Sequence, residues 1–155
     1  MLGSLTFASK VAMAALPNVH IVGTLMMAST VVFRRKALIP IYLYVTLEGL
    51  YSGFSFLWLS NLYTWAVLWG MTMLIPKRTP RKIKCIAYPA VCSLHGFLFG
   101  ILTAPVWAAA FGWGIKETIL SGVAFDITHG ISNLVAGMLV LPLADLFSRF
   151  MKRKK

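Results

Sequence analysis

Two helical turns in the C-terminal third of the sequence carry the side chains best suited to chemistry. Asp126, His129 and Asn133 follow one another at spacings of three and four residues. An α-helix turns about 100° per residue, so these side chains fall on one narrow stripe that also holds Gly130 and Gly137. Because the surrounding residues are mostly Ile, Leu, Val, Met and Phe, the stripe must face other protein or a water-filled cavity.

The sequence leaves two interpretations of this stripe open. Asp126 and His129 could satisfy each other and only hold helices together. Alternatively, the stripe lines a polar pocket or an ion path, the default hypothesis for an acid inside a membrane. Glu48 is a second such acid, near the middle of an apolar run at 37–59 and about 15 Å from its basic end. It too could be a protonated carboxyl that bonds to a neighbouring helix.

These residues lie in a chain of 155 residues, of which 59% are hydrophobic and 12% are charged. About a quarter of the residues in a soluble domain are charged, so we expect an all-α integral membrane protein with a single domain over residues 1–155. The net charge of +11 does not indicate a nucleic-acid partner. Thirteen of the fifteen Lys and Arg gather beside apolar runs, at 34–36, 77–84 and 149–155, which is typical of cytoplasmic loops.

The apolar runs predict a bundle of six transmembrane helices, with outer turns at Ser60–Asn61 and at 113–117. The first two runs are short, so they could also form one helix kinked at Pro17–Asn18, which would give five spans. The fifth run repeats small residues every four positions, which predicts close packing along the whole helix. This ladder consists of Gly96, Gly100, Ala104, Ala108 and Gly112.

Aromatic residues gather around the first predicted outer turn. Trp58, Tyr63 and Trp65 bracket it, where such rings mark either the membrane interface or a stacking platform for a ring-shaped ligand. The cysteines, Cys85 and Cys92, have no other ligand at metal-binding spacing beside them. We therefore expect neither a metal site nor a cofactor.

Five segments, in order and spread over nearly the whole chain, resemble the substrate-binding S components of energy-coupling factor (ECF) transporters. They are PNV at 17–19, FRRKA at 33–37, LEGLYSGF at 47–54, LYTW at 62–65 and GVAFDITHGISNL at 122–134. The resemblance implies a six-helix bundle in the bacterial plasma membrane with both termini cytoplasmic, and it favours two helices over one kinked helix. Lys10, inside the first apolar run, departs from the family's pattern.

The resemblance also implies a function and its residues. Such a subunit captures a vitamin or related micronutrient between the loop after helix one and the outer halves of helices four to six. Here those elements supply Asn18, His20, Tyr63, Trp65, Trp107, Trp113, Lys116, Asp126, His129 and Asn133. Ala8 and Ala12 match the face of helix one that contacts a transmembrane coupling subunit. Two ATPase subunits would supply ATP hydrolysis, and the chain itself, which has no phosphate-binding loop, would not be an enzyme.

Other function classes fit parts of the pattern. A stand-alone proton- or cation-coupled carrier would use Glu48 and Asp126 as proton sites. A small intramembrane enzyme would use Asp126 and His129, with Glu48 as a further candidate, as acid–base or metal groups. A purely structural subunit would keep the stripe dry and internally paired. The Trp and Tyr residues and few charges of the outer half favour a planar heterocycle of low net charge as the ligand.

Overall fold

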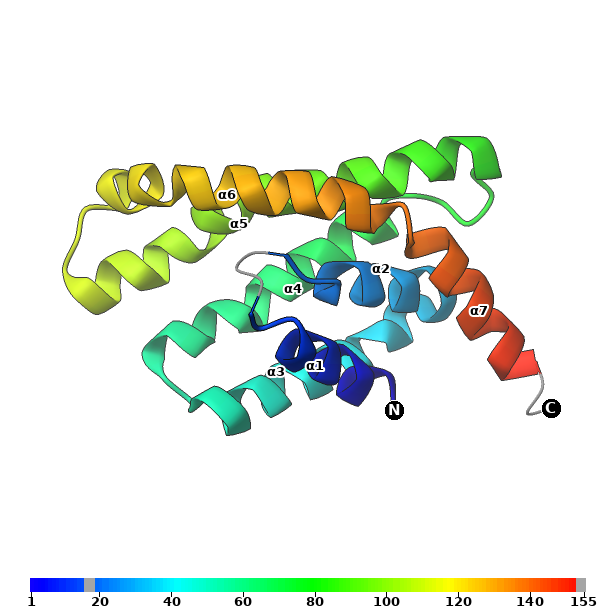
Figure 1. Cartoon of the computed structure of the whole chain (residues 1–155), viewed down its shortest axis with the longest axis horizontal. Helices are drawn as coiled ribbons and strands as arrows, with labels where there is room; N and C mark the ends of the chain where they lie inside the picture. The colour runs from blue at the N-terminus through cyan, green and yellow to red at the C-terminus, as the bar shows by residue number, and fades with distance from the viewer. Residues whose placement is uncertain (16–18, 153–155) are drawn as a thin grey trace.

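The computed structural model describes residues 1–15 and 19–152, and this part of the chain is helical without strands (Figure 1). Two short 3-10 helices, η1 (Arg34–Ala37) and η2 (Phe56–Trp58), precede α3 and α4. The α-helices are α1 (Leu2–Ala12), α2 (Val22–Phe33), α3 (Leu38–Ser52), α4 (Leu59–Met73), α5 (Arg81–Phe111), α6 (Ile115–Gly137) and α7 (Val140–Lys152). The all-α class expected from the sequence is confirmed.

Two of these helices, α5 and α6, are long and apolar enough to cross a membrane. They have 31 and 23 residues, and only 33% and 22% of their most apolar windows are buried inside the protein. Large apolar side chains of both helices are exposed, among them Ile86 of α5 and Ile131 and Val135 of α6. This outward apolar surface is consistent with membrane association.

The first two apolar runs form two separate helices. α1 ends at Ala12, and α2 begins at Val22 after residues 13–15 and 19–21, which are not helical. The alternative of one kinked helix is therefore wrong. Pro17 and Asn18 lie outside the described residues. α2 is the central helix of the fold, since all residues from Val22 to Thr30 are buried.

The turn between α3 and α4 does not lie at Ser60–Asn61, where the sequence predicted it. α3 ends at Ser52, because Gly53 adopts a left-handed conformation with φ of 89° that few other residues tolerate. Ser55 then accepts a hydrogen bond from the backbone N–H of Trp58 over 3.3 Å, which starts η2. Ser60 and Asn61 belong to the first turn of α4. Glu48 consequently lies one turn from the end of α3 and not near the middle of a span.

The final apolar run, expected as one helix, is broken in the structure. α6 ends at Gly137, and the N–H groups of Met138 and Leu139 bond to carbonyls three residues back, at 3.2 and 3.0 Å. Pro142 lies in the first turn of α7, where its missing N–H costs no helical hydrogen bond. α7 turns away from α6 (Figure 1) and packs its buried Ala144 and Phe147 into a cluster with α2.

α5 and α6 lie side by side along most of their length (Figure 1). A Cβ on Gly96 would lie 2.9 Å from the Cα of Gly130, so the two backbones approach as closely as glycine permits. Ala104 and Ala108 of the same ladder are buried, and Gly112 ends α5 with φ of 69°. The close packing predicted from the small-residue ladder is confirmed at Gly96 and Gly100 but not at Gly112, where an added Cβ would meet no atom within 4 Å.

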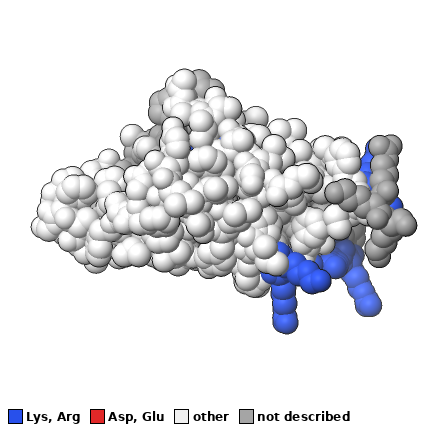
Figure 2. All heavy atoms as spheres, turned by 90° about the horizontal axis from the view of Figure 1, so that it is seen from below, with Lys and Arg blue, Asp and Glu red and all other residues white. Residues whose placement is uncertain are grey.

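The basic clusters meet at one end of the long axis, which we call the basic end. Arg34, Lys77, Arg81 and Lys84 line one cavity of about 340 Å³ there, together with Asp145. Figure 2 shows Lys and Arg side chains gathered toward this end, while the opposite end of the visible face carries none. We call that opposite end, around the turns at 53–58 and 112–114, the aromatic end.

Candidate functional site

The polar stripe on α6 is turned inward. The buried residues of this helix are Asp126, His129, Gly130, Asn133 and Gly137. These are the five residues that helical periodicity placed on one face. α5 lies beside them, with Gly96 against Gly130 and Gly100 against Asp126, so the stripe faces protein as predicted.

Asp126 and His129 do not satisfy each other. Asp126 Oδ1 accepts a hydrogen bond from the backbone N–H of Gly100 over 2.9 Å. A Cβ at position 100 would collide with this carboxylate, so the glycine allows the carboxylate of Asp126 to approach the α5 backbone. Neither ring nitrogen of His129 has a hydrogen-bond partner. The interpretation of the stripe as an internally paired structural contact is therefore not supported at these two residues.

A cavity of about 280 Å³ lies between α5 and α6 near the aromatic end, and we call it the α5–α6 cavity. Trp107 and Trp113 line it, each packed on Phe111 with ring centroids 5.6 and 5.2 Å apart. Asp126 is its acidic residue, and Thr103, Thr118 and Ser121 add hydroxyl groups. Aromatic walls with a few convergent polar groups are typical of small-molecule sites.

All three histidines of the sequence meet beside this cavity. The rings of His20 and His129 lie edge to face with centroids 5.1 Å apart, and Phe99 stacks on His129 at 5.0 Å. Phe99 also contacts the rings of Trp65 and His95 and lines the α5–α6 cavity. We call His20, Trp65, His95, Phe99 and His129 the ring cluster.

Several buried polar atoms in and beside the ring cluster have no hydrogen-bond partner. They are His20 Nδ1, Trp65 Nε1, both ring nitrogens of His129, and Asn133 Oδ1. His95 differs, because its Nε2 lies 3.0 Å from the carbonyl oxygen of Thr64. A buried polar group without a partner costs about 1–3 kcal/mol, so such a concentration calls for an explanation. A bound ligand or ordered water would supply the missing partners.

A second cavity, of about 230 Å³, lies on the other side of α5 against the turn between α3 and α4. We call it the α3–α5 cavity. It shares Phe99, Thr103 and Trp107 with the α5–α6 cavity, so the two are separated by a common wall. Its polar lining is Glu48, Ser52, Ser55, Ser60 and Asn61.

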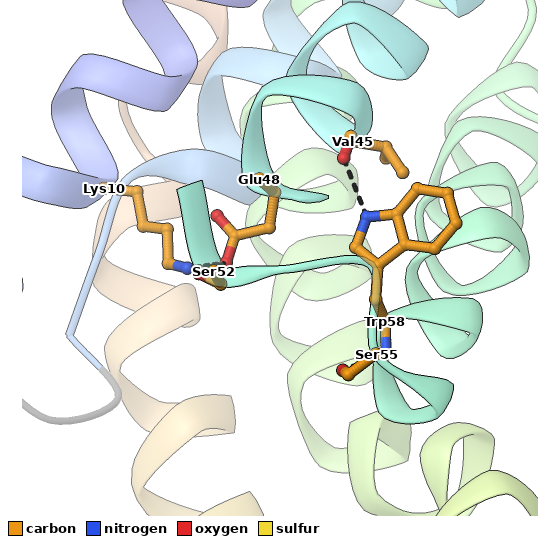
Figure 3. Close-up of polar contacts among 6 residues, drawn as sticks. All are labelled: Lys10, Val45, Glu48, Ser52, Ser55 and Trp58. Atoms are coloured by element: carbon orange, nitrogen blue, oxygen red, sulfur yellow. Dashed lines mark hydrogen bonds and ion pairs between the residues drawn. The ribbon is translucent and has the colours of Figure 1, made fainter. Parts of the chain in front are cut away.

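Glu48 and Lys10 form an ion pair that joins α3 to α1. Ser52 also donates to the same carboxylate oxygen, Oε1, over 3.1 Å. Figure 3 shows Lys10 reaching across from α1 toward Glu48 and Ser52. The residue that departed from the family's pattern, Lys10, thus has a specific partner, and Glu48 is held by a cation rather than by a neutral neighbour.

The remaining predicted ligand residues lie apart from this centre. Tyr63 donates its hydroxyl to the carbonyl of Leu102 over 2.6 Å, and Lys116 is exposed at the start of α6. Neither lines one of the two cavities. Asn18 lies outside the described residues. Sequence reasoning missed Phe99, which touches both cavities and the ring cluster, because one Phe on an apolar helix carries no distinguishing signal.

The described part of the chain contains no candidate metal site. Among residues 1–15 and 19–152, no three His, Cys, Asp or Glu side chains are placed to hold a metal ion.

In comparisons with known proteins, no protein-family model, no curated protein and no solved structure matches this chain.

Proposed function

We propose that this chain is the membrane-embedded substrate-binding subunit of an ECF-type importer in a bacterial plasma membrane. The observation that carries the proposal is the α5–α6 cavity, which combines an aromatic wall with the carboxylate of Asp126. Through Phe99 this cavity adjoins the ring cluster, whose buried polar atoms lack partners. Its ligand would be a planar, vitamin-like micronutrient. The rings of Trp107 and Trp113 suit stacking, while Asp126, His129 and Asn133 offer donors and acceptors to a heterocycle.

The exposed surface of α1 supports the proposal that a coupling subunit binds this chain. Gly3 and Thr6 are buried, and a Cβ on Gly3 would lie 2.9 Å from Leu43 Cβ of α3. Ala8 and Ala12 lie on the opposite, exposed side of α1. Two small exposed side chains one turn apart allow another membrane helix to approach closely. A transmembrane coupling subunit would bind here, and two ATPase subunits would provide ATP hydrolysis.

The first experiment is native mass spectrometry of the protein purified in detergent from its own host. We expect a bound molecule of vitamin size, together with a coupling subunit and ATPases. A chain that carries only lipid and has no partner proteins would contradict the proposal.

Variants of the stripe then locate the ligand. Asp126→Asn and Asn133→Ala should each weaken ligand affinity by about 1–3 kcal/mol, the cost of one hydrogen bond lost in a buried site. Thr128→Ala is the matched control, because Thr128 is on the same helix but exposed. Unchanged affinity in both stripe variants would move the ligand elsewhere.

Variants of α1 test the partner. Ala8→Trp and Ala12→Trp should prevent co-purification of the coupling subunit and leave ligand affinity intact, because neither side chain is near a cavity. Leu50→Trp, at a position 67% exposed on α3, is the control for adding a large apolar surface. Full assembly of both α1 variants would exclude this face as the contact.

A stand-alone cation-coupled carrier is the second candidate, favoured by the buried acids Glu48 and Asp126. It predicts uptake by vesicles that contain this chain alone, driven by a pH gradient. Uptake that requires ATP and partner subunits would exclude it. An enzyme finds less support, because Asp126 bonds to Gly100 and does not orient the ring of His129.

A further inference from the structure

Glu48 has one carboxylate oxygen that the protein leaves unused. The residue is only 7% exposed, and Lys10 and Ser52 both bind its Oε1. Its other oxygen, Oε2, is buried and has no hydrogen-bond partner. Glu48 also lines the α3–α5 cavity. A buried carboxylate oxygen without a partner is costly, so this one marks a place where a donor group is missing.

Three donor groups near Glu48 are already used within the protein. The indole N–H of Trp58 points away to the carbonyl of Val45, at 2.9 Å (Figure 3). The hydroxyl of Ser60 donates to the carbonyl of Leu57, and the hydroxyl of Ser52 donates to Glu48. Both hydroxyl oxygens keep lone pairs to accept further bonds. Ser55 and Asn61 also line the cavity and can both donate and accept. The unpartnered carboxylate oxygen of Glu48 is therefore the group that favours a donor with positive charge.

We propose that the α3–α5 cavity is a subsite for a cationic nitrogen group on a flat ring, such as an amidinium or an aromatic ammonium. Glu48 binds the cation through Oε2, while Phe99 and Trp107, the wall shared with the α5–α6 cavity, pack on the ring. This subsite deepens the proposed function and rests on it, since it lies against the wall that it shares with the α5–α6 cavity. It names the ligand class more narrowly: a planar heterocycle with a basic nitrogen.

The same carboxylate links the subsite to α1. A cation at Oε2 competes with Lys10 for the single negative charge of Glu48, so ligand binding weakens the hold of α3 on α1. α1 carries the exposed Ala8 and Ala12. Occupancy of the subsite is thereby communicated to the face where the coupling subunit would bind. Conversely, Lys10 opposes the binding of any cation.

Benzamidine and benzamide test the subsite, because they share size and shape and differ in charge. Ligand-observed NMR with the full chain in detergent gives the affinity of each probe. We expect the wild type to prefer benzamidine by roughly tenfold, the value of a charged hydrogen bond. Glu48→Gln should abolish this preference, whereas Lys10→Met should increase it by removing the competing cation.

A purely structural ion pair predicts a different pattern, in which Glu48→Gln and Lys10→Met both leave the ratio of the two affinities unchanged. That pattern would overturn the inference, as would equal binding of the two probes by the wild type. Asp126→Asn is the control: if it removes the preference, the cation binds in the α5–α6 cavity instead. Should Glu48→Gln fail to give a monodisperse protein, the direction of the Lys10→Met effect decides alone.

The failure of this subsite is distinguishable from failure of the importer. Native mass spectrometry without adduct or partners contradicts the importer and leaves the probe measurement valid. Equal binding of benzamidine and benzamide contradicts the subsite, while a co-purified neutral heterocycle with ATPases would still support the importer.

Discussion

The two ends of the molecule treat their polar groups in opposite ways. At the basic end, the guanidinium of Arg34 donates to the carbonyls of Met73 and Ile75 at 2.9 and 3.2 Å. Trp69 in turn donates to the carbonyl of Arg34 over 3.1 Å. Lys84 donates to the carbonyl of Lys77. These bonds join the end of α2 to the end of α4 and fix the loop that enters α5.

Toward the aromatic end, several buried polar atoms stay unpartnered, either in the lining of the α3–α5 cavity or in the ring cluster that Phe99 joins to both cavities. His129 and Glu48 both contribute such atoms. The contrast teaches that the polar residues of this chain have two separate roles. Those of the basic end stabilise the fold, whereas the unpartnered ones toward the aromatic end are the groups to which the proposed function assigns a ligand.

The largest effect should come from filling the contact between α5 and α6 toward the basic end. A Cβ on Gly137 would lie 2.7 Å from the Cα of Pro89, a backbone atom that cannot move aside. Gly137→Ala should lower the free energy of unfolding by about 3 kcal/mol, measured by chemical denaturation in detergent. Gly70→Ala is the control, since its added Cβ would meet no atom within 4 Å and alanine favours the helix. A similar loss in both variants would contradict this assignment.

Gly100→Ala makes the matching change at the aromatic end. There the added Cβ meets the side chain of Asp126, which can swing into the α5–α6 cavity. The loss of stability should be clearly smaller than for Gly137→Ala, and ligand affinity should fall instead. Equal destabilisation by the two substitutions would break the distinction between the two ends.

Arg34→Ala should have the next largest effect. It removes two charged hydrogen bonds to the end of α4, and we expect the free energy of unfolding to fall by about 2 kcal/mol. Arg35→Ala, at the neighbouring exposed position, should be nearly neutral in the same denaturation measurement. If both variants were neutral, the Arg34 contacts would not stabilise the basic end.

Two histidines in the ring cluster allow the same comparison between a bonded and an unbonded polar side chain, with smaller expected effects on stability. His95→Phe removes a bond to the carbonyl of Thr64 and should cost about 1–2 kcal/mol of stability. His129→Phe removes no hydrogen bond and should change stability by less than about 1 kcal/mol, yet weaken ligand binding. A larger stability loss at His129 than at His95 would indicate that His129 is a structural residue.

The smallest effect should come from the exposed ion pair between Arg81 and Asp145, whose closest atoms are 2.7 Å apart. The Arg81 guanidinium, through its hydrogen bond, holds the pKa of Asp145 below its usual range. Its contribution to stability is thus present above a pH of about 4 and is lost as the pH falls through the lowered pKa. Asp145→Asn should change the unfolding midpoint only slightly at pH 7, and not at all in strong acid. A large change at neutral pH would contradict the small value expected for exposed pairs.

Residues on one helix were predictable from the sequence, and contacts between helices were not. Helical periodicity placed Asp126, His129 and Asn133 on one buried face, because 3.6 residues per turn is a local property. The convergence of His20 and His95 on that face depends on how helices pack, and no spacing in the sequence encodes it. The partnership of Lys10 with Glu48, 38 residues apart, is hidden for the same reason.

The boundary errors have local causes. The sequence prediction placed the turn at the polar pair Ser60–Asn61 rather than at Gly53, although glycine is the residue suited to the positive φ at which α3 ends. Gly137 followed by Pro142 carried the signal for the break between α6 and α7, which the uniformly apolar composition obscured. In both places one backbone requirement outweighed the average hydrophobicity of the segment.

The helices differ greatly in length, and this has a consequence for the lipids around them. α1 has 11 residues and α5 has 31, which correspond to roughly 16 and 46 Å at 1.5 Å per residue. In the membrane-embedded state that we propose, a bilayer with a hydrocarbon thickness of about 30 Å would have to thin beside α1 and would be overspanned by α5. Hydrophobic mismatch of opposite sign on two sides of one protein favours a tilted orientation. Longer acyl chains would increase the strain beside α1, so the protein should be sensitive to lipid length as well as to its own sequence.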